Sequence, residues 1–150
     1  MDKELAFEDW VKTVPSKLRA DPLWESLYYR LAIYLFDLVW QDVEIIRRDF
    51  RGREIVGQLV RCAGSNSANM EESYGRGLGS GDFVRIIRIA FGEACETQGW
   101  YFRSRHILES DLIDRRIAVI DQIISLLVNL ISRHRKIQAA RKLNSTTNNA

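Results

Sequence analysis

Proline is confined to the start of this chain, and its absence elsewhere is the feature that most constrains the fold. The two prolines are Pro15 and Pro22, and no later segment alternates apolar and polar residues with the period of two that strands require. Apolar residues instead recur every three or four positions, as on one face of an α-helix. The sequence therefore predicts an all-α protein. Short connections between long helices favour an antiparallel, up-down-up-down four-helix bundle.

The chain divides into three expected parts. Residues 1–20 form a short helical lead-in segment, and residues 21–141 form the four-helix bundle. Residues 142–150 are dominated by Asn, Ser and Thr, which bury too little apolar surface to fold, so we expect a disordered tail.

Local signals place the ends of the bundle helices. Asp21 followed by Pro22 suits a helix start, since Asp is a favoured N-cap and proline is tolerated in the first turn. Four glycines within residues 75–81 carry too high an entropic cost to remain helical, so they predict the middle hairpin. The expected helices run from Pro22 to a charged turn at 47–54, from about 54 to 73, from Ser80 or Asp82 to about 108, and from Ser110 to about 140.

Two of these helices carry more apolar residues than one core-facing stripe requires. The predicted core stripes are Leu27, Leu31, Tyr34, Leu38 and Ile45 in the first helix, and Ile113, Ile117, Ile120, Ile124, Leu127 and Ile131 in the fourth. A second apolar stripe exposed on a monomer would be unusual, so we expect a homo-oligomer. The alternative is that the N-terminal segment covers the first helix by itself. The predicted oligomer interface comprises Tyr29, Ile33, Phe36, Trp40, Gly92, Gly99, Ile123 and Leu130.

Positive charge is concentrated downstream of residue 44. Residues 1–44 hold nine acids and five bases, whereas residues 45–150 hold eleven acids and seventeen bases. Most of the cations are arginine, whose planar fork suits phosphate groups, although arginine is also common on solvated helix surfaces. A further basic cluster is Arg133, His134, Arg135 and Lys136. The residues predicted to bind nucleic acid are Arg47, Arg48, Arg51, Arg76, Arg85, Arg88 and Arg103.

No recognisable catalytic or cofactor motif accompanies these residues. The glycine loop lacks the GK[ST] ending of a phosphate-binding P-loop, and neither His106 nor His134 has the Glu three residues earlier that a bundle di-metal site requires. We therefore expect no catalytic residues, no metal and no cofactor. Glu72 and Glu96 are expected to have a structural role, such as pairing with Arg61.

Cysteine usage and hydropathy indicate the expected setting of the protein. Cys62 and Cys95 have no zinc-like spacing, and both are expected to be buried thiols. The charged N-terminus is unlike a secretory signal, and we expect no run of the roughly 20 apolar residues that a bilayer requires. A cytoplasmic protein with no membrane partner is expected.

A family resemblance rests on the second helix and the hairpin. The runs Gln58-Leu59-Val60-Arg61-Cys62-Ala63 and Asn69-Met70-Glu71-Glu72-Ser73-Tyr74-Gly75-Arg76 resemble the QLRRAA and SNIAEGYGR signatures of a four-helix bundle family. That family includes proteins encoded within 23S rRNA intervening sequences and the accessory protein of diversity-generating retroelements. Phe83, Ala90, Gly92 and Glu96 match its third-helix pattern, and the resemblance covers about residues 23–135. Ser67, Ser73 and Gln98 depart from its usual proline, glycine and glutamate.

The resemblance implies an antiparallel bundle that assembles into a ring, often a pentamer, and in the retroelement relatives a basic surface that binds nucleic acid and a reverse transcriptase. With the charge distribution, it predicts a non-enzymatic, homo-oligomeric accessory protein that binds RNA or DNA. The alternative is a protein-protein interaction scaffold that binds no nucleic acid.

Overall fold

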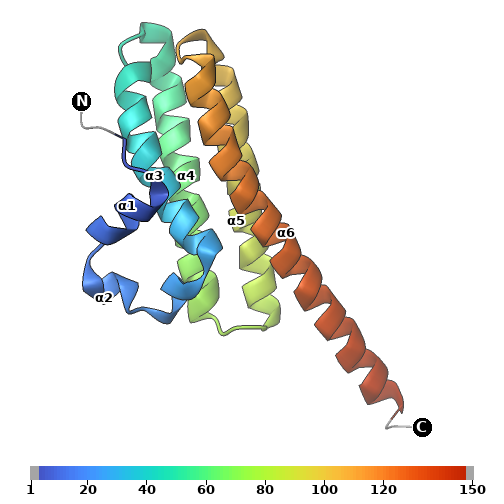
Figure 1. Ribbon diagram of the computed structural model, residues 1–150. Coiled ribbons are helices and arrows are strands. Elements are labelled where there is room, and N and C mark those ends of the chain that lie inside the picture. The colour runs from blue at the N-terminus through green and yellow to red at the C-terminus, as the bar shows by residue number, and fades with distance from the viewer. Residues whose placement is uncertain (1–3, 148–150) are drawn as a thin grey trace.

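A computed structural model describes residues 4–147, and within that range the chain is helical with no strand. Four long helices form the bundle: α3 (Leu27–Ile46), α4 (Arg53–Gly75), α5 (Gly81–Arg103) and α6 (Ser110–Thr147). They alternate in direction, as Figure 1 shows, and α3 contacts α4 and α6 while α5 contacts the same two helices. The predicted all-α, up-down-up-down four-helix bundle is therefore confirmed.

The first bundle helix begins later than predicted. The Asp21 carboxylate accepts a hydrogen bond from the Leu23 backbone N–H, 2.8 Å away, and so caps the short 3-10 helix η1 (Pro22–Glu25). Ser26 then has an extended backbone, and α3 starts at Leu27. Asp21 and Pro22 therefore do begin a helical element, but that element is η1 and not the first bundle helix as predicted. The reason is that η1 buries Leu23 and Trp24 and turns the chain before α3 begins.

Glycine is required at both connections that flank α4. Between α3 and α4, the 3-10 helix η2 (Phe50–Gly52) packs so closely that a Cβ on Gly52 would lie 2.2 Å from the carbonyl oxygen of Ile46. In the predicted hairpin after α4, Gly77 and Gly79 have φ angles of +93° and +79°, which favour glycine. Ser80 then caps α5 by accepting a 3.1 Å hydrogen bond from the Phe83 N–H, as the sequence predicted.

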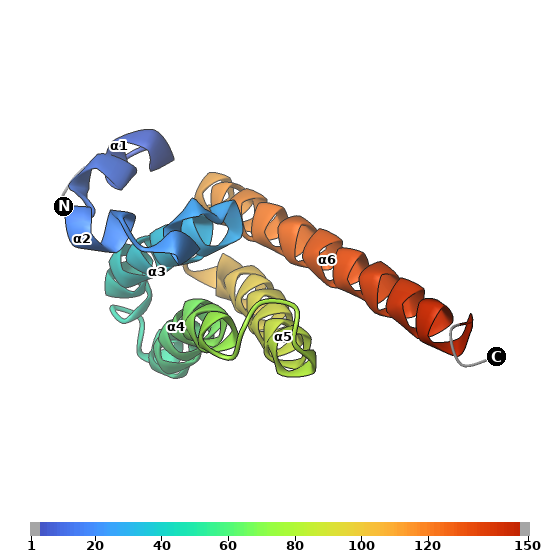
Figure 2. The same ribbon diagram turned by 90° about the horizontal axis from the view of Figure 1, so that it is seen from below.

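The N-terminal arm, residues 4–25, folds against α3 and lies to one side of the bundle in Figures 1 and 2. It contains α1 (Phe7–Thr13), α2 (Ser16–Arg19) and η1. The Trp10 indole donates a 2.6 Å hydrogen bond to Asp37, and the Tyr34 hydroxyl donates a 2.8 Å hydrogen bond to the Leu5 carbonyl. Trp10 also packs against the rings of Tyr34 and Trp24. The arm therefore covers part of α3, as the alternative to an oligomer had supposed.

Helix α6 is much longer than its partners and extends beyond the hairpin into open space (Figures 1 and 2). Near the point where it leaves the bundle, the rings of His134 and Phe83 are in contact, with centroids 5.0 Å apart. The helix continues to Thr147, so residues 142–147 are helical rather than the predicted disordered tail, and residues 148–150 lie outside the described residues. An uninterrupted helix satisfies its own backbone hydrogen bonds without burying side chains.

By length and composition alone, residues 110–145 of α6 qualify as a helix that could cross a membrane, with a mean hydropathy of 1.4 over the best window. The expectation that no apolar run approaches that size was therefore wrong. Only 17% of that window is buried in the bundle, although α6 does supply buried Ile113, Ile120 and Leu127 to the core.

Candidate nucleic-acid and assembly surfaces

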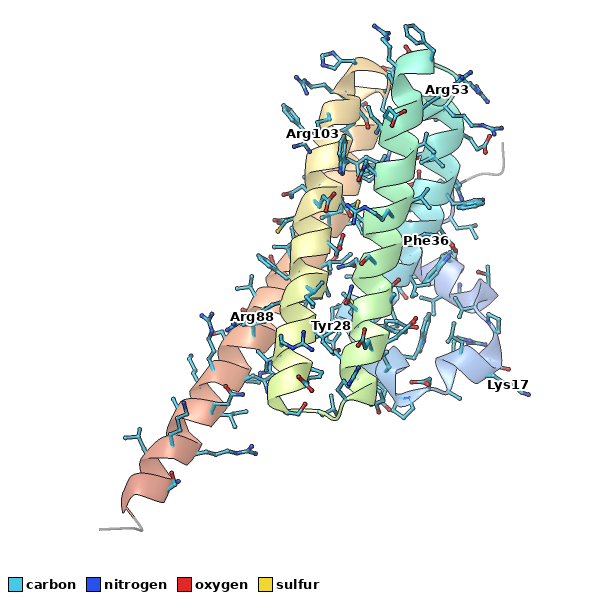
Figure 3. All side chains as sticks on the ribbon, turned by 180° about the vertical axis from the view of Figure 1, so that it is seen from behind. Lys17, Tyr28, Phe36, Arg53, Arg88 and Arg103 are labelled. Atoms are coloured by element: carbon cyan, nitrogen blue, oxygen red, sulfur yellow. The ribbon has the colours of Figure 1, made fainter. Side chains whose placement is uncertain are left out.

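The predicted nucleic-acid-binding arginines lie at two ends of the bundle. Arg47, Arg48 and Arg51 follow the end of α3, and Arg103 ends α5 beside them, whereas Arg76 and Arg85 flank the hairpin at the opposite end. Figure 3 shows Arg53 and Arg103 at one end and Arg88 in the half where α6 leaves the bundle. The fold therefore does not bring these arginines together on one surface of a single chain.

Local ion pairs neutralise several of these arginines. The shortest pairs join Arg47 to Glu44 and Arg51 to Asp49, each with an N–O distance of 2.6 Å. Hydrogen bonds from Arg51 lower the pKa of Asp49 to about 2, so this pair stays ionised at neutral pH. The other two pairs are Arg76–Glu72 at 3.1 Å and Arg85–Asp82 at 3.4 Å.

Arg48, Arg88 and Arg103 form no ion pair with any carboxylate in residues 4–147. The Arg103 guanidinium instead lies 4.8 Å from the centre of the Trp100 ring. These three exposed cations are the members of the predicted set that remain available for phosphate.

Two of the predicted oligomer-interface residues are buried within the chain, so their assignment was wrong. Tyr29 packs edge-on against Trp24 and its hydroxyl donates a 2.8 Å hydrogen bond to Glu71 of α4. Ile123 lies in the core of the bundle and is fully buried. The helical period placed both residues on a second apolar stripe. In the structure η1 and α4 cover Tyr29, and the neighbouring helices cover Ile123.

The remaining predicted interface residues are uncovered to different extents. Trp40 has 61% of its surface exposed, while Ile33, Phe36 and Leu130 are half-buried against the core. A Cβ on Gly92 would meet no atom within 4 Å, so this position of α5 opens to solvent. At Gly99 the Arg103 side chain already occupies that space, because a guanidinium nitrogen lies 2.8 Å from the point that a Cβ would take.

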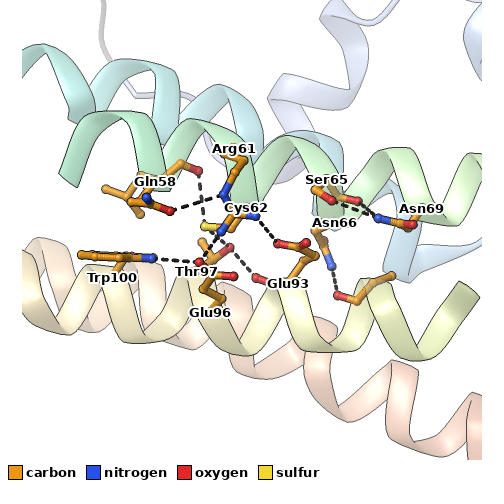
Figure 4. Close-up of polar contacts among 12 residues, drawn as sticks. Gln58, Arg61, Cys62, Ser65, Asn66, Asn69, Glu93, Glu96, Thr97 and Trp100 are labelled. Atoms are coloured by element: carbon orange, nitrogen blue, oxygen red, sulfur yellow. Dashed lines mark hydrogen bonds and ion pairs between the residues drawn. The ribbon is translucent and has the colours of Figure 1, made fainter. Parts of the chain in front are cut away.

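A polar network joins α4 to α5 at the residues that carry the family resemblance (Figure 4). Arg61 donates hydrogen bonds to Glu93, at 3.3 Å, and to Glu96, so the predicted pairing of Arg61 with Glu96 is confirmed. The Trp100 indole also donates to Glu96, at 3.2 Å. The bond from Arg61 lowers the pKa of the Glu96 carboxyl. Both carboxylates of this network serve helix packing.

Glu72 and the cysteines differ from their predicted roles. Glu72 pairs with Arg76 one helical turn away rather than with Arg61. Cys62 is buried beside Thr97, 3.1 Å away, and its burial raises the thiol pKa. Cys95 is exposed, so the prediction of two buried thiols was wrong for this residue. It lies on the outward side of α5, between core residue Ala94 and the Arg61 partner Glu96.

A buried charged cluster on α3, α5 and α6 is the principal feature that sequence reasoning missed. We call it the Arg116 cluster: Arg116 donates hydrogen bonds to Asp42, at 2.7 and 3.0 Å, and to Glu4, at 2.9 and 3.0 Å. The Tyr101 hydroxyl donates to Asp42 at 2.7 Å. Arg116 and Asp42 are each only 2% exposed. Helices α3, α5 and α6 and the N-terminal arm therefore meet at one ionic centre.

Electrostatics keep Arg116 and Glu4 ionised. Burial acts against a charged guanidinium, but hydrogen bonds to Asp42 and Glu4 outweigh it and raise the pKa of Arg116. The same contact lowers the pKa of Glu4, and burial beside Asp42 raises that of Tyr101. A signal was present in the sequence, since Arg116 lies three residues after Ile113 and four before Ile120, within the predicted core stripe of α6.

A pocket of about 410 Å³ opens beside the Arg116 cluster, with Trp40, Ile45, Arg48 and Leu112 among its lining residues. Its buried charges already satisfy one another. No group of three or more His, Cys, Asp or Glu residues in the described range could hold a metal ion. Among the charged residues that line the pocket, Arg48 is the one that forms no ion pair in residues 4–147.

The sequence matches no family model and no curated protein. Its fold is similar to the solved structure of a protein of unknown function from the S23 ribosomal protein family of Bacteroides thetaiotaomicron, with a TM-score of 0.62 and 18% sequence identity. The similarity covers 70% of this chain and 98% of that chain. At this identity the likeness establishes a shared helical bundle fold.

Proposed function

We propose that this protein is a non-enzymatic, cytoplasmic, homo-oligomeric accessory protein that binds nucleic acid through its assembled form. The observation that carries the proposal is α6, which extends beyond the bundle (Figure 1) and carries exposed apolar and basic side chains such as Ile137 and Lys136. An isolated helix extension of this kind gains stability when another surface covers its apolar residues.

Self-association is supported by the apolar residues left exposed on α3 and α6. Trp40 on α3 and Ile137 on α6 are exposed, and half-buried Leu126 and Leu130 lie on the same side of α6 as Ile137 at 100° per residue. Uncovered apolar surface on soluble proteins marks interaction sites. Together with the resemblance described above, it supports a ring, with a pentamer as the expected form.

Self-association is tested by sedimentation velocity or light scattering at tens of micromolar protein. Trp40→Ser combined with Leu130→Ser should dissociate the oligomer. Leu78→Ser, which alters an exposed apolar residue of the hairpin, is the matched control and should leave the mass unchanged. A wild-type chain that remains monomeric would refute the ring.

Nucleic-acid binding is supported by the excess of arginine after residue 44 and by Arg48, Arg88 and Arg103, which pair with no carboxylate in the described range. A ring repeats each arginine around its axis and increases the number of phosphates contacted at once. The solved neighbour belongs to a family whose name refers to the ribosome, which is in keeping with an RNA partner. Fluorescence anisotropy with labelled RNA and DNA should show binding that weakens steeply with salt, and no binding at about 50 mM salt would refute the proposal.

The second candidate is a protein-protein scaffold, for example for a reverse transcriptase, without nucleic-acid binding. The ion pairs made by Arg47, Arg51, Arg76 and Arg85 favour it, because they reduce the positive charge left for phosphate. Affinity purification with and without nuclease separates the two functions. A stoichiometric protein partner that survives nuclease, with no binding of purified RNA or DNA, would support the scaffold.

A further inference from the structure

A groove of about 560 Å³ runs between α5 and α6 where α6 leaves the bundle. Its apolar floor is formed by Phe91, Val128 and Ile131, and Arg88 and Arg135 stand on opposite helices at its sides. Phe91 and Ile131 are half-buried against the core, so the floor is held in place by the bundle. Neither arginine pairs with a carboxylate in the described part of the chain.

The charge on α6 beyond this groove has one sign. The last acidic residue of the whole sequence is Asp121, so no carboxylate side chain follows it, whereas Arg133, Arg135, Lys136 and Arg141 all do. These four residues are exposed on the projecting helix, and at 100° per residue they point to different sides of it. The groove therefore opens beside a helix segment that carries positive charge around its circumference and no acidic side chain, and its complement is a polyanion.

The groove lies away from the apolar stripe proposed for self-association. At 100° per residue, Leu130 and Ile137 lie about 140° and 160° around α6 from Arg135. Arg88 is exposed on α5, on the side of the molecule seen in Figure 3. A ring that buries Leu130 and Ile137 can therefore leave Arg88 and Arg135 accessible.

We infer that the α5–α6 groove binds single-stranded nucleic acid, with bases against Phe91, Val128 and Ile131 and phosphates at Arg88 and Arg135. This inference rests on the proposed function and names its ligand and site. An aromatic ring beside a basic groove suits unstacked bases, whose faces stack on aromatic side chains without sequence preference. In a duplex the base faces are stacked on one another and cannot reach such a floor. The basic turns of α6 beyond the groove extend the contact along the strand.

The test measures anisotropy of fluorescein-labelled 20-nucleotide oligo-U and oligo-dT, and of a 20-base-pair duplex, against the full-length protein. Arg88→Gln with Arg135→Gln should weaken single-strand binding by about tenfold or more, since charge-assisted contacts are lost. The slope of log K against log salt should become shallower by about 1.4, which is about 0.7 for each of the two phosphates. Arg88→Lys with Arg135→Lys should preserve the slope.

Two further variants isolate the groove. Phe91→Leu keeps apolar volume but removes the stacking face, so it should weaken single-strand binding by about fivefold or more without changing the salt slope. Lys17→Gln with Arg19→Gln removes the same charge from exposed positions of α2 in the N-terminal arm and should leave the affinity within about twofold. Far-ultraviolet circular dichroism and light scattering on every variant verify the fold and the oligomer.

The outcomes separate this inference from the proposed function. If the wild type binds none of the three probes, both fail. If the wild type binds but the Arg88/Arg135 glutamine variant binds equally well with an unchanged slope, the groove assignment is wrong and nucleic-acid binding stands. Equal or tighter binding of the duplex would overturn the single-strand assignment, and dissociation of the oligomer by that variant would identify the groove as an interface between copies of the chain.

Discussion

Replacing Asp42 with asparagine should destabilise the protein far more than an ordinary charge removal. In the Arg116 cluster Asp42 accepts hydrogen bonds from the Arg116 guanidinium and from the Tyr101 hydroxyl at 2.7 to 3.0 Å. All three side chains are almost completely buried. The amide of asparagine is neutral, and its NH2 group is a donor where the Asp42 carboxylate has an accepting oxygen. Arg116 is then left with Glu4 as its only carboxylate partner.

The magnitude follows from the burial of the pair. Removing one partner of a buried ion pair costs about 3 to 5 kcal/mol, because the remaining charge stays desolvated. Glu4 offsets little of this loss, since its side chain is 35% exposed and screened by water. For a domain of this size the expected decrease in melting temperature is roughly 6 to 20 °C.

Urea unfolding monitored by circular dichroism, at one fixed protein concentration, measures the change in the free energy of unfolding. Glu72→Gln breaks the exposed pair with Arg76 and is the control, with an expected change within about 0.5 kcal/mol. A loss below about 1 kcal/mol for Asp42→Asn would refute the reasoning that burial makes this pair essential.

An apolar replacement of the whole cluster separates charge from packing. The triple variant Asp42→Leu, Tyr101→Phe and Arg116→Met removes every polar group that would be left unpaired in the core. Buried ion pairs replaced by apolar side chains of similar volume are often neutral or stabilising. The triple variant should therefore recover most of the stability that Asp42→Asn loses. If it does not, the ion pairs and hydrogen bonds of the cluster contribute more to stability than the cost of burying their charges.

Three further predictions concern single positions. Gly52→Ala should destabilise the fold by more than about 1 kcal/mol in urea unfolding, because its Cβ would lie 2.2 Å from a backbone oxygen, whereas Gly57→Ala, with open space around it, should stabilise α4 by up to about 1 kcal/mol. Ellman's reagent should modify Cys95 in the native protein and Cys62 only after unfolding; native modification of Cys62 would contradict its burial. The hydrogen bonds from Arg116 lower the pKa of Glu4 below its ordinary value of 4.5. Ionised Glu4 therefore stabilises the N-terminal arm fully at pH values above 4.5, and this stabilisation is lost as the pH falls through the lowered pKa. The acid-induced shift of tryptophan emission in the wild type should be reduced in Glu4→Gln, and an identical acid titration of both proteins would contradict this account.

Much of the fold could be predicted because its signals are local. The spacing of apolar residues identified each bundle helix, and the glycines at 77 and 79 with Ser80 identified the hairpin and its cap. The pairing of Arg61 with Glu96 could be predicted through the resemblance of the two helices to a known pattern. Boundaries were less accurate where a short element intervened, as η1 does before α3.

The candidate surfaces could be predicted only in part. Periodicity shows which residues share a helix face, but a face is exposed only if no other element covers it. Tyr29 was assigned to an interface because nothing in its local sequence reveals that Trp24 and Glu71 enclose it. The predicted arginines shared a residue type, and only the arrangement of helices showed that they lie at two ends of the bundle.

The sequence by itself determined that the chain is helical, where its hairpin lies and which sides of its helices are apolar, since these properties depend on residues a few positions apart. The tertiary structure alone decided which partners meet across the bundle. Asp42 and Arg116 are 74 positions apart, and their pairing depends on the relative height and rotation of α3 and α6. Those two quantities arise from the packing of whole helices, to which every core side chain contributes, and no short stretch of sequence encodes them.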